Sequence, residues 1–424
     1  MGHDVSSGLY DRALSLMPGG VSSPVRAVKP YPLYLRQGRG ARVVDADGNE
    51  YLDLVLGYGP LILGHAHPAV VKALQEQAAL GTLYGAPHEK EVLLAEKVSK
   101  HFPGMEMMRF VSSGTEATMH ALRLARGCTG RRKIIKVDGG FHGAHDAVLV
   151  RSGSGALTHG SPDSEGVPEE VAANTLVVDY NDVAQMEMAL RANTRQVAAI
   201  ILEPMLGNVG PVPPGPGYLK EVRRLADEHG TVLIFDEVIT GLRLSLGGAQ
   251  GFYGVRPDLT VLGKVLGGGM PMGAFGGPRE MMSHISPLGK VYQAGTYSGN
   301  PMSLSAGLAT MEVLEAHGLN GLNEKGNGLR DRLTGILAKT GTEALVQGEG
   351  SMFQLFFGKG PLRNAREVLA CDRSRYMDLY RRMLELGVIM PPSQFETCFL
   401  SLAHGREETE RLLSAFGQAL EGPR

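Results

Sequence analysis

Short runs of apolar residues, many of them β-branched, recur through the middle of the chain without alternating with polar residues. Two clear examples are VAAIIL (197–202) and TVLIF (231–235), and a segment with helical spacing, GYLKEVRRLADEHG (217–230), lies between them. Strands that are apolar on both sides are buried on both faces, which is typical of a parallel sheet covered by helices. Strands that alternate with helices in this way indicate an α/β protein. The sequence therefore predicts a mostly parallel central sheet with helices over it.

The 424 residues are enough for more than one domain. We predict an N-terminal segment over 1–60, a large α/β domain over 61–300 and a smaller α+β domain over 301–424. Within the first segment, helical spacing predicts a helix over 7–16, and the Asp47–Gly48 pair predicts a hairpin turn.

The composition argues against several classes of protein. The formal net charge is −2, without the basic stripe that is typical of nucleic-acid-binding proteins. No apolar run reaches the roughly 18 residues that a membrane span needs. The three cysteines, Cys128, Cys371 and Cys398, lie far apart and form neither a metal spacing nor a disulfide framework. We therefore expect a cytoplasmic protein with no nucleic-acid or membrane partner.

One lysine is the only charged residue in a long apolar and glycine-rich stretch, TVLGKVLGGGMPMGAFGG (260–277). Burial among apolar neighbours lowers the pKa of a lysine amine and makes Lys264 a candidate for Schiff-base chemistry. A lysine that extends its ammonium group to solvent explains this position equally well. Asp236 follows the strand TVLIF, at the end where open α/β sheets bind ligands. The adjacent Glu237 is better explained as a cap of the next helix.

The segment VSSGTEATMHALRLARG (111–127) begins a helix with small polar residues and a glycine. The N–H groups at a helix N-terminus bind phosphate, and the hydroxyls of Ser113 and Thr115 add to such a site, although an ordinary N-cap explains the same residues. Together with Lys264 and Asp236, this turn describes a ligand with a phosphate, a carbonyl and a basic nitrogen. Pyridoxal 5′-phosphate has all three, and an aspartate keeps its ring nitrogen protonated.

The segment FHGAHD (141–146) offers an aromatic ring, Phe141, that could stack on the cofactor. His142, His145 and Asp146 in the same segment also resemble a group of metal ligands. No other part of the sequence supplies obvious further ligands, so we expect no metal.

Ten ordered motifs extend this evidence over essentially the whole chain. They are GGVSSPVRA, DADGNEYLDLVLGYGPLILGHAHP, RFVSSGTEATMHALRLARG, FHGAHD, SGSGALT, EPMLGNVG, IFDEVITGLR, GGAQGFYGVRPDLTVLGKVLGGGMPMGAFGG, YQAGTYSGNP and PPSQFE. With these motifs the sequence resembles the class III aminotransferases, which depend on pyridoxal phosphate. The resemblance implies the α/β fold called fold type I, with a smaller α+β domain, and a homodimer.

The resemblance also implies a role for individual residues. Lys264 would bond to the cofactor aldehyde and move protons, and Asp236 would pair with the ring nitrogen. The remaining cofactor contacts would come from Ser113, Gly114, Thr115, Phe141, Asn208 and, across the dimer interface, Thr296. The substrate would be bound by Ser23, Arg26, Ser154 and Glu396. The family usually has Tyr-His-Gly-His-Ala-Asp where this chain has FHGAHD, so Phe141 has no phenol and His145 is displaced by one position.

Within the family, the sequence favours an isomerase over a transaminase. Relatives that act on ω-amines carry Glu-Pro-x-Gln-Gly-Glu, and Asn208 replaces the last acid in EPMLGN (203–208). The resemblance implies transfer of an amine within glutamate 1-semialdehyde, through 4,5-diaminovalerate, to give the tetrapyrrole precursor 5-aminolevulinate. A class III ω-aminotransferase is the alternative. The Ser/Gly/Pro-rich stretch over 152–170 is predicted to be a mobile loop that retains the diamine as a lid.

Overall fold

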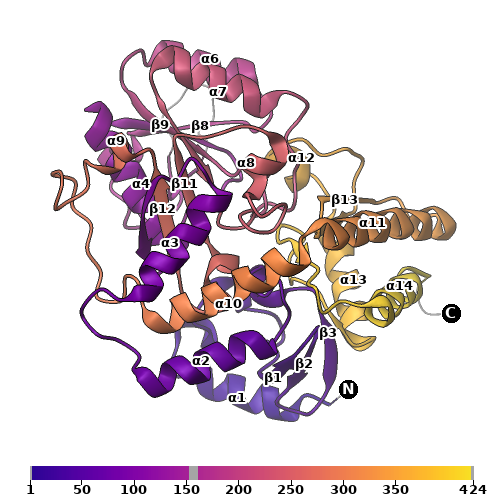
Figure 1. Cartoon of the computed structure of the whole chain (residues 1–424). Coiled ribbons are helices and arrows are strands. Elements are labelled where there is room, and N and C mark those ends of the chain that lie inside the picture. Colours follow the sequence, from indigo (N-terminus) through magenta and orange to yellow (C-terminus); the bar gives the residue numbers. More distant parts are fainter. Residues whose placement is uncertain (1, 152–160, 422–424) are drawn as a thin grey trace. The chain divides into compact units, whose positions relative to one another are not determined.

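The computed structural model describes residues 2–151 and 161–421 (Figure 1). The chain divides into two compact units. Unit 1 comprises 1–68, 322–361 and 370–424, and unit 2 comprises 69–321 and 362–369. The three-part division that the sequence suggests stays a prediction, which limited proteolysis can test.

Unit 2 is built on a seven-stranded sheet with the order β4-β12-β11-β10-β9-β5-β8. The strands are β4 (Met107–Val111), β5 (Lys133–Val137), β8 (Thr175–Val178), β9 (Val197–Leu202), β10 (Val232–Asp236), β11 (Leu259–Gly263) and β12 (Gly273–Gly277). Strand β12 pairs antiparallel with both β4 and β11, while β11, β10, β9, β5 and β8 pair in parallel. The predicted mostly parallel sheet is confirmed, and the reversed strand β12 is an addition to it.

Helices pack against this sheet, as the prediction of an α/β protein requires (Figure 1). Ala121 and Leu124 of the helix α4 share a buried apolar cluster with Ile201 of β9 and Ile234 of β10. Helix α7 packs against strand β10 and against helix α6. The helices of this region are α2 (Pro68–Leu80), α3 (Glu89–His101), α4 (Gly114–Thr129), α5 (Glu169–Ala172), α6 (Val183–Ala192), α7 (Tyr218–His229), α8 (Gly248–Tyr253), α9 (Arg279–Met282), α10 (Pro301–His317) and α12 (Ala365–Leu369).

Helices α3 and α10 pack together and share an ion-pair cluster. The Glu315 carboxylate accepts hydrogen bonds from Lys97 Nζ at 2.7 Å and from His101 Nε2 at 2.8 Å. These bonds lower the pKa of Glu315 from 4.5 to about 2, and the bond from Lys97 has the largest effect. A carboxyl whose pKa is lowered by folding stabilises the protein above its ordinary pKa, and this stabilisation is lost as the pH falls through the lowered value.

We therefore expect Glu315→Gln to lower the melting temperature at pH 7, by a few degrees, and to differ less and less from the wild type as the pH approaches 2. Thermal unfolding followed by circular dichroism at a series of pH values measures this. Glu96→Gln, at an exposed acid of α3, is the matched control. A pH-independent difference between Glu315→Gln and the wild type would contradict the prediction.

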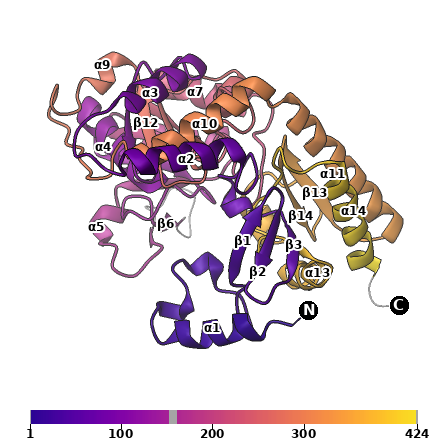
Figure 2. The ribbon, with the colours of Figure 1, turned by 60° about the horizontal axis from the view of Figure 1, so that its bottom comes forward.

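Unit 1 contains two small sheets with helices around them (Figure 2). The first sheet has the order β1-β2-β3-β15 and the second the order β13-β14-β16. The strands are β1 (Leu35–Arg39), β2 (Arg42–Asp45), β3 (Glu50–Asp53), β13 (Leu345–Glu349), β14 (Met352–Phe356), β15 (Val388–Ile389) and β16 (Cys398–Phe399). The helices are α1 (Asp4–Leu14), α11 (Asn320–Thr340), α13 (Arg373–Glu385) and α14 (Arg406–Glu421). None of the described helices has both the length and the hydropathy that crossing a membrane requires.

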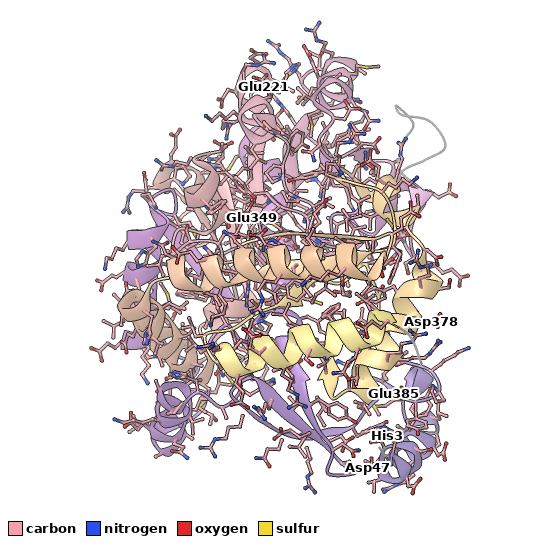
Figure 3. The ribbon with its side chains drawn as sticks, turned by 90° about the vertical axis from the view of Figure 1, so that its right-hand side faces the viewer. His3, Asp47, Glu221, Glu349, Asp378 and Glu385 are labelled. Carbon is pink, nitrogen blue, oxygen red and sulfur yellow. The ribbon has the colours of Figure 1, made fainter. Side chains whose placement is uncertain are left out.

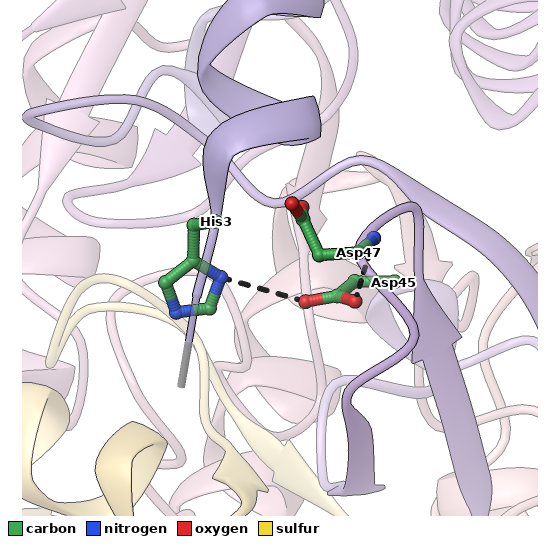
Figure 4. Close-up of side chains that lie close together, drawn as sticks. All are labelled: His3, Asp45 and Asp47. Carbon is green, nitrogen blue, oxygen red and sulfur yellow. Dashed lines mark hydrogen bonds and ion pairs between the residues drawn. The ribbon is translucent and has the colours of Figure 1, made fainter.

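The hairpin predicted at Asp47–Gly48 is confirmed, because β2 and β3 pair antiparallel around that turn. Helix α1, however, spans 4–14 instead of the predicted 7–16. Its first turn is capped by Asp47, whose carboxylate accepts the N–H groups of Val5 at 2.7 Å and Ser6 at 3.0 Å. His3 and Asp47 accordingly lie close together (Figure 3), and His3 Nδ1 is 3.5 Å from the Asp45 carboxylate (Figure 4). A cap supplied from a distant turn leaves no mark in the helix's own sequence.

Candidate active site

The carboxyl ends of two adjacent strands place Asp236 and Lys264 at the same edge of the large sheet. Strands β10 and β11 are parallel neighbours, and Asp236, the last residue of β10, is in register with Val261. Lys264 follows three residues later, at the start of the 3₁₀ turn η4 (Lys264–Gly267). Its φ of +41° lies in the left-handed region. Such a conformation costs about 1–3 kcal/mol in a non-glycine residue and is concentrated at functional sites.

Asp236 is held by a histidine that the sequence analysis did not assign to it. The Asp236 side chain is only 4% exposed. Its Oδ2 lies 2.8 Å from His142 Nδ1, and its Oδ1 accepts the N–H of Val238 at 3.1 Å. His142 is 1% exposed, and its Nε2 has no hydrogen-bond partner within the described part of the chain. The pair therefore fixes a buried carboxylate in one orientation.

The neighbouring acid has a different role, as predicted. Glu237 is fully buried, and its carboxylate accepts the backbone N–H of Gln250 at 2.9 Å and the Gln250 side-chain amide at 3.0 Å. It also accepts the N–H of Ala249, so it caps the start of helix α8. The interpretation of Glu237 as a helix cap is confirmed.

The proposed phosphate turn is the N-terminus of helix α4. The Ser113 hydroxyl accepts the N–H of Glu116 at 3.1 Å, and the Glu116 carboxylate accepts the N–H of Ser112 at 2.9 Å. Ser113 therefore does serve as an ordinary N-cap. The N–H groups of Gly114 and Thr115 in the first turn have no partner within the helix, which is the arrangement that binds anions.

Glycines allow other segments to approach this turn closely. A Cβ on Gly143, whose φ is +96°, would lie 2.6 Å from Thr115 Oγ1. A Cβ on Gly273 would lie 2.3 Å from the carbonyl oxygen of Ser113. The glycines therefore form a narrow cradle around the turn, which any side chain at these positions would fill.

The FHGAHD segment separates its two histidines. While His142 contacts Asp236, His145 Nε2 lies 3.5 Å from the Thr118 hydroxyl. Burial lowers the pKa of His145 to about 4, so its imidazole is neutral near pH 7. Phe141 is 53% exposed, which leaves its ring available to a ligand.

Among residues 2–151 and 161–421, the one group of side chains with spacing suited to a metal is His3, Asp45 and Asp47, in unit 1. Both carboxylates of that group already accept hydrogen bonds from the surrounding chain.

A second buried acid, Glu203, organises the residues beside Asp236. It is 2% exposed, and its Oε1 accepts the N–H of Phe141 at 2.9 Å and the Asn208 amide Nδ2 at 3.0 Å. Sequence reasoning did not single out Glu203. The one available signal was its place directly after the apolar strand β9, which resembles the place of Asp236 at the end of β10.

Three of the predicted substrate-binding residues belong to unit 1. Ser23 precedes the 3₁₀ turn η2 (Pro24–Arg26), and Arg26 is its last residue. The Tyr58 hydroxyl donates to the carbonyl oxygen of Val25 at 3.2 Å. Burial and the charge of Glu396 raise the pKa of Tyr58 to about 12, and the charge of Arg26 opposes this. Arg26 and Glu396 thus both contribute to the electrostatic surroundings of Tyr58, which sequence reasoning missed.

Two predicted positions remain. Ser154 lies outside the described residues, as do all of residues 152–160 of the predicted 152–170 loop. The flanking strands β6 (Val150–Arg151) and β7 (Ser161–Pro162) pair antiparallel. Thr296 lies exposed on the loop before α10.

The residues of unit 2 fit pyridoxal phosphate by the chemistry of their donors and acceptors. The turn at Gly114 and Thr115 offers N–H groups in a glycine-lined cradle, as a phosphate requires. Asp236 offers a buried carboxylate, as a protonated ring nitrogen requires. Phe141 offers an exposed aromatic face, and Lys264 offers an amine at the same edge of the sheet as Asp236.

Comparison with known proteins adds independent evidence. The model of the class-III aminotransferase family matches residues 24–420. The glutamate-1-semialdehyde 2,1-aminomutase of Methanothrix thermoacetophila is 54% identical over 98% of this chain and 96% of that protein. The enzyme of the same name from Archaeoglobus fulgidus is 53% identical over 98% of this chain and 99% of its own.

Solved structures are similar over the whole fold. An omega-transaminase from Sphaerobacter thermophilus has a TM-score of 0.93 and 35% identity, covering 98% of this chain and 97% of that one. A variant of a glutamate-1-semialdehyde-aminomutase from Pseudomonas aeruginosa PAO1, in complex with PMP, has a TM-score of 0.89 and 27% identity, covering 99% of this chain and 94% of that one.

Proposed function

Since the chain belongs to the class III aminotransferase family, with its fold type I α/β architecture, we propose that it is a glutamate-1-semialdehyde 2,1-aminomutase. This enzyme is an isomerase that converts glutamate 1-semialdehyde to 5-aminolevulinate, a precursor of tetrapyrroles. The observation that carries the proposal is 54% identity to an aminomutase over nearly the whole chain. The similarity to an omega-transaminase is strong in fold but reaches only 35% identity. The alternative, a class III ω-aminotransferase, is therefore less well supported.

The cofactor is pyridoxal phosphate, which supplies an electron sink for the charge left when a proton leaves carbon. Ser113, Gly114 and Thr115 hold its phosphate, and Phe141 and Asn208 contact its ring. Asp236 stabilises the protonated ring nitrogen, and His142 Nδ1 keeps the Asp236 carboxylate oriented.

Lys264 Nζ is the group that removes a proton from one substrate carbon and returns it to another. A base held within reach of both carbons contributes about 10²–10⁴-fold to the rate. Ser23 and Arg26 bind the substrate carboxylate, for which a guanidinium has the matching geometry. We also propose that Glu396 and Ser154 line the substrate site, and that the stretch 152–170 acts as a lid that excludes water and retains the diamine.

We further infer a homodimer in which Thr296 reaches the cofactor phosphate of the partner. Thr296 is exposed, and Leu288, Tyr292 and Tyr297 on the same loop are large exposed apolar residues. Clusters of this kind mark protein interfaces. Sedimentation equilibrium should give twice the mass of one chain. A cytoplasmic location is part of the same proposal, and the three free cysteines suit a reducing compartment.

A product assay tests the function. The purified protein, loaded with cofactor, is expected to form 5-aminolevulinate from glutamate 1-semialdehyde alone, without any keto acid or second amine. An aminotransferase needs both an amine donor and a carbonyl acceptor in stoichiometric amounts. In the alternative case, turnover would stop after about one equivalent of product per active site and would resume only when a keto acid is added. That result would establish a class III ω-aminotransferase.

A further inference from the structure

The buried carboxylate of Glu203 joins two segments that are distant in the sequence. Its Oε1 accepts from Phe141 N–H and Asn208 Nδ2, and its Oε2 accepts the N–H of Gly207 at 2.8 Å. All three contacts come from N–H donors, which suits an ionised carboxylate. An isolated buried charge of this kind is costly, and hydrogen bonds are the usual compensation.

The geometry of the sheet explains why these segments meet. Strands β5 and β9 are parallel neighbours, so the segment after β5, with Phe141, and the segment after β9, with Asn208, leave the same edge. A glycine permits the close approach. A Cβ on Gly139, whose φ is +80°, would lie 3.0 Å from the Val209 side chain.

The contact with Glu203 also decides how Asn208 is turned. The amide nitrogen of Asn208 faces the carboxylate, which leaves its carbonyl oxygen directed elsewhere. Glu203 further belongs to the electrostatic environment of the ring-nitrogen site. Burial raises its pKa, while the nearby charge of His142 lowers it and that of Asp236 raises it.

We propose that Glu203 is a positioning residue for the cofactor: it fixes the backbone at Phe141 and the amide of Asn208, the two residues that contact the ring. This inference rests on the proposed use of pyridoxal phosphate. It does not depend on which substrate the enzyme converts. The role of Glu203 can therefore be wrong while the proposed function is right, and the proposed function can be wrong while the role of Glu203 is right.

The test is the binding of pyridoxal phosphate to the apoprotein of Glu203→Gln, followed by absorbance. A glutamine at position 203 has one side-chain oxygen to accept hydrogen bonds in place of two. Its amide nitrogen would face one of the N–H groups that now donate to Glu203, and two donors cannot bond to each other. We expect the dissociation constant to rise about tenfold, the usual effect of losing a hydrogen bond to a charged group. We also expect the pH titration of the bound cofactor's absorbance to shift, because a negative charge near Asp236 is lost.

Glu237→Gln is the matched control, since Glu237 is an equally buried carboxylate that accepts backbone N–H groups but caps helix α8. It should lower the melting temperature of the apoprotein while leaving the dissociation constant of pyridoxal phosphate unchanged. If the two variants changed cofactor binding equally, Glu203 would have only a general structural role and the proposal would be overturned.

A double-mutant cycle tests whether Glu203 acts on cofactor binding through Asn208 or through the backbone at Phe141. If Glu203 acts partly through Asn208, the effect of Glu203→Gln on the dissociation constant should shrink in an Asn208→Ala background. Full additivity would reject that route. Should Glu203→Gln not fold, a crystal structure of the wild-type holoenzyme decides, because Phe141 and Asn208 must contact the ring while both remain bonded to Glu203. Loss of either bond in that structure would overturn the proposal.

Discussion

Lys264→Ala is expected to lower kcat by about four orders of magnitude, while the protein continues to bind pyridoxal phosphate. Alanine cannot accept a proton from the substrate, and general acid–base catalysis accounts for up to about 10⁴-fold. The phosphate turn at the start of α4 and the carboxylate of Asp236 are untouched by the change, so binding of the cofactor should weaken far less than catalysis. Turnover by product assay and absorbance after gel filtration measure the two quantities.

Covalent attachment gives a second readout. Borohydride reduction should fix the cofactor to the wild-type chain at Lys264, as peptide mass spectrometry can show, and should leave Lys264→Ala unlabelled. Lys220→Ala, at an exposed lysine of helix α7 in the same unit, is the matched control and should behave like the wild type. Near-normal turnover in Lys264→Ala would refute the role of this amine.

Asp236→Asn is expected to lower kcat by about 10³-fold, the scale of removing one preorganised electrostatic partner. The asparagine oxygen can still accept from His142 Nδ1, so the shape of the site is kept and the negative charge is lost. Without that charge, the site would no longer stabilise a proton on the ring nitrogen, so the bound cofactor would be a weaker electron sink.

The control for this variant is Asp258→Asn, at the opposite end of β11. The Asp258 carboxylate accepts the N–H of Leu233 at 2.7 Å and pairs with Arg223 at 3.0 Å. Its loss should lower the melting temperature and leave kcat nearly unchanged. A drop in kcat for Asp258→Asn as large as that for Asp236→Asn would show that the effect is not specific to the ring-nitrogen site.

Much of the fold could be predicted because the strands of the large sheet are buried on both faces. Every residue of β9 and β10 is buried, so their apolar runs stand out without any knowledge of their partners. Strand β12 has the sequence GAFGG, and it escaped prediction because glycine is disfavoured in strands. Close packing explains its composition: a Cβ on Gly276 would lie 2.6 Å from the carbonyl oxygen of Met107.

The candidate site was predictable where one residue type performs one recognisable task. Lys264 and Asp236 were found because a charge in apolar surroundings requires an explanation. His142, Glu203 and Tyr58 were missed because their importance lies in their contacts with other segments. His142 and Asp236 are 94 residues apart, and Phe141 and Glu203 are 62 apart. Such pairs become visible only when the fold brings the segments together.

The reversed strand β12 also has a consequence for how the chain matures on the ribosome. Strand β4 hydrogen-bonds to β12 alone within the large sheet, and β12 ends only at Gly277. At about 5–20 residues per second, translation would leave β4 without its neighbour for on the order of ten seconds or more. Strand β3 lacks its neighbour β15 for longer still, because β15 begins only at Val388. Nascent chains of this protein are therefore expected to need protection from aggregation by chaperones at least until Val388 has been synthesised.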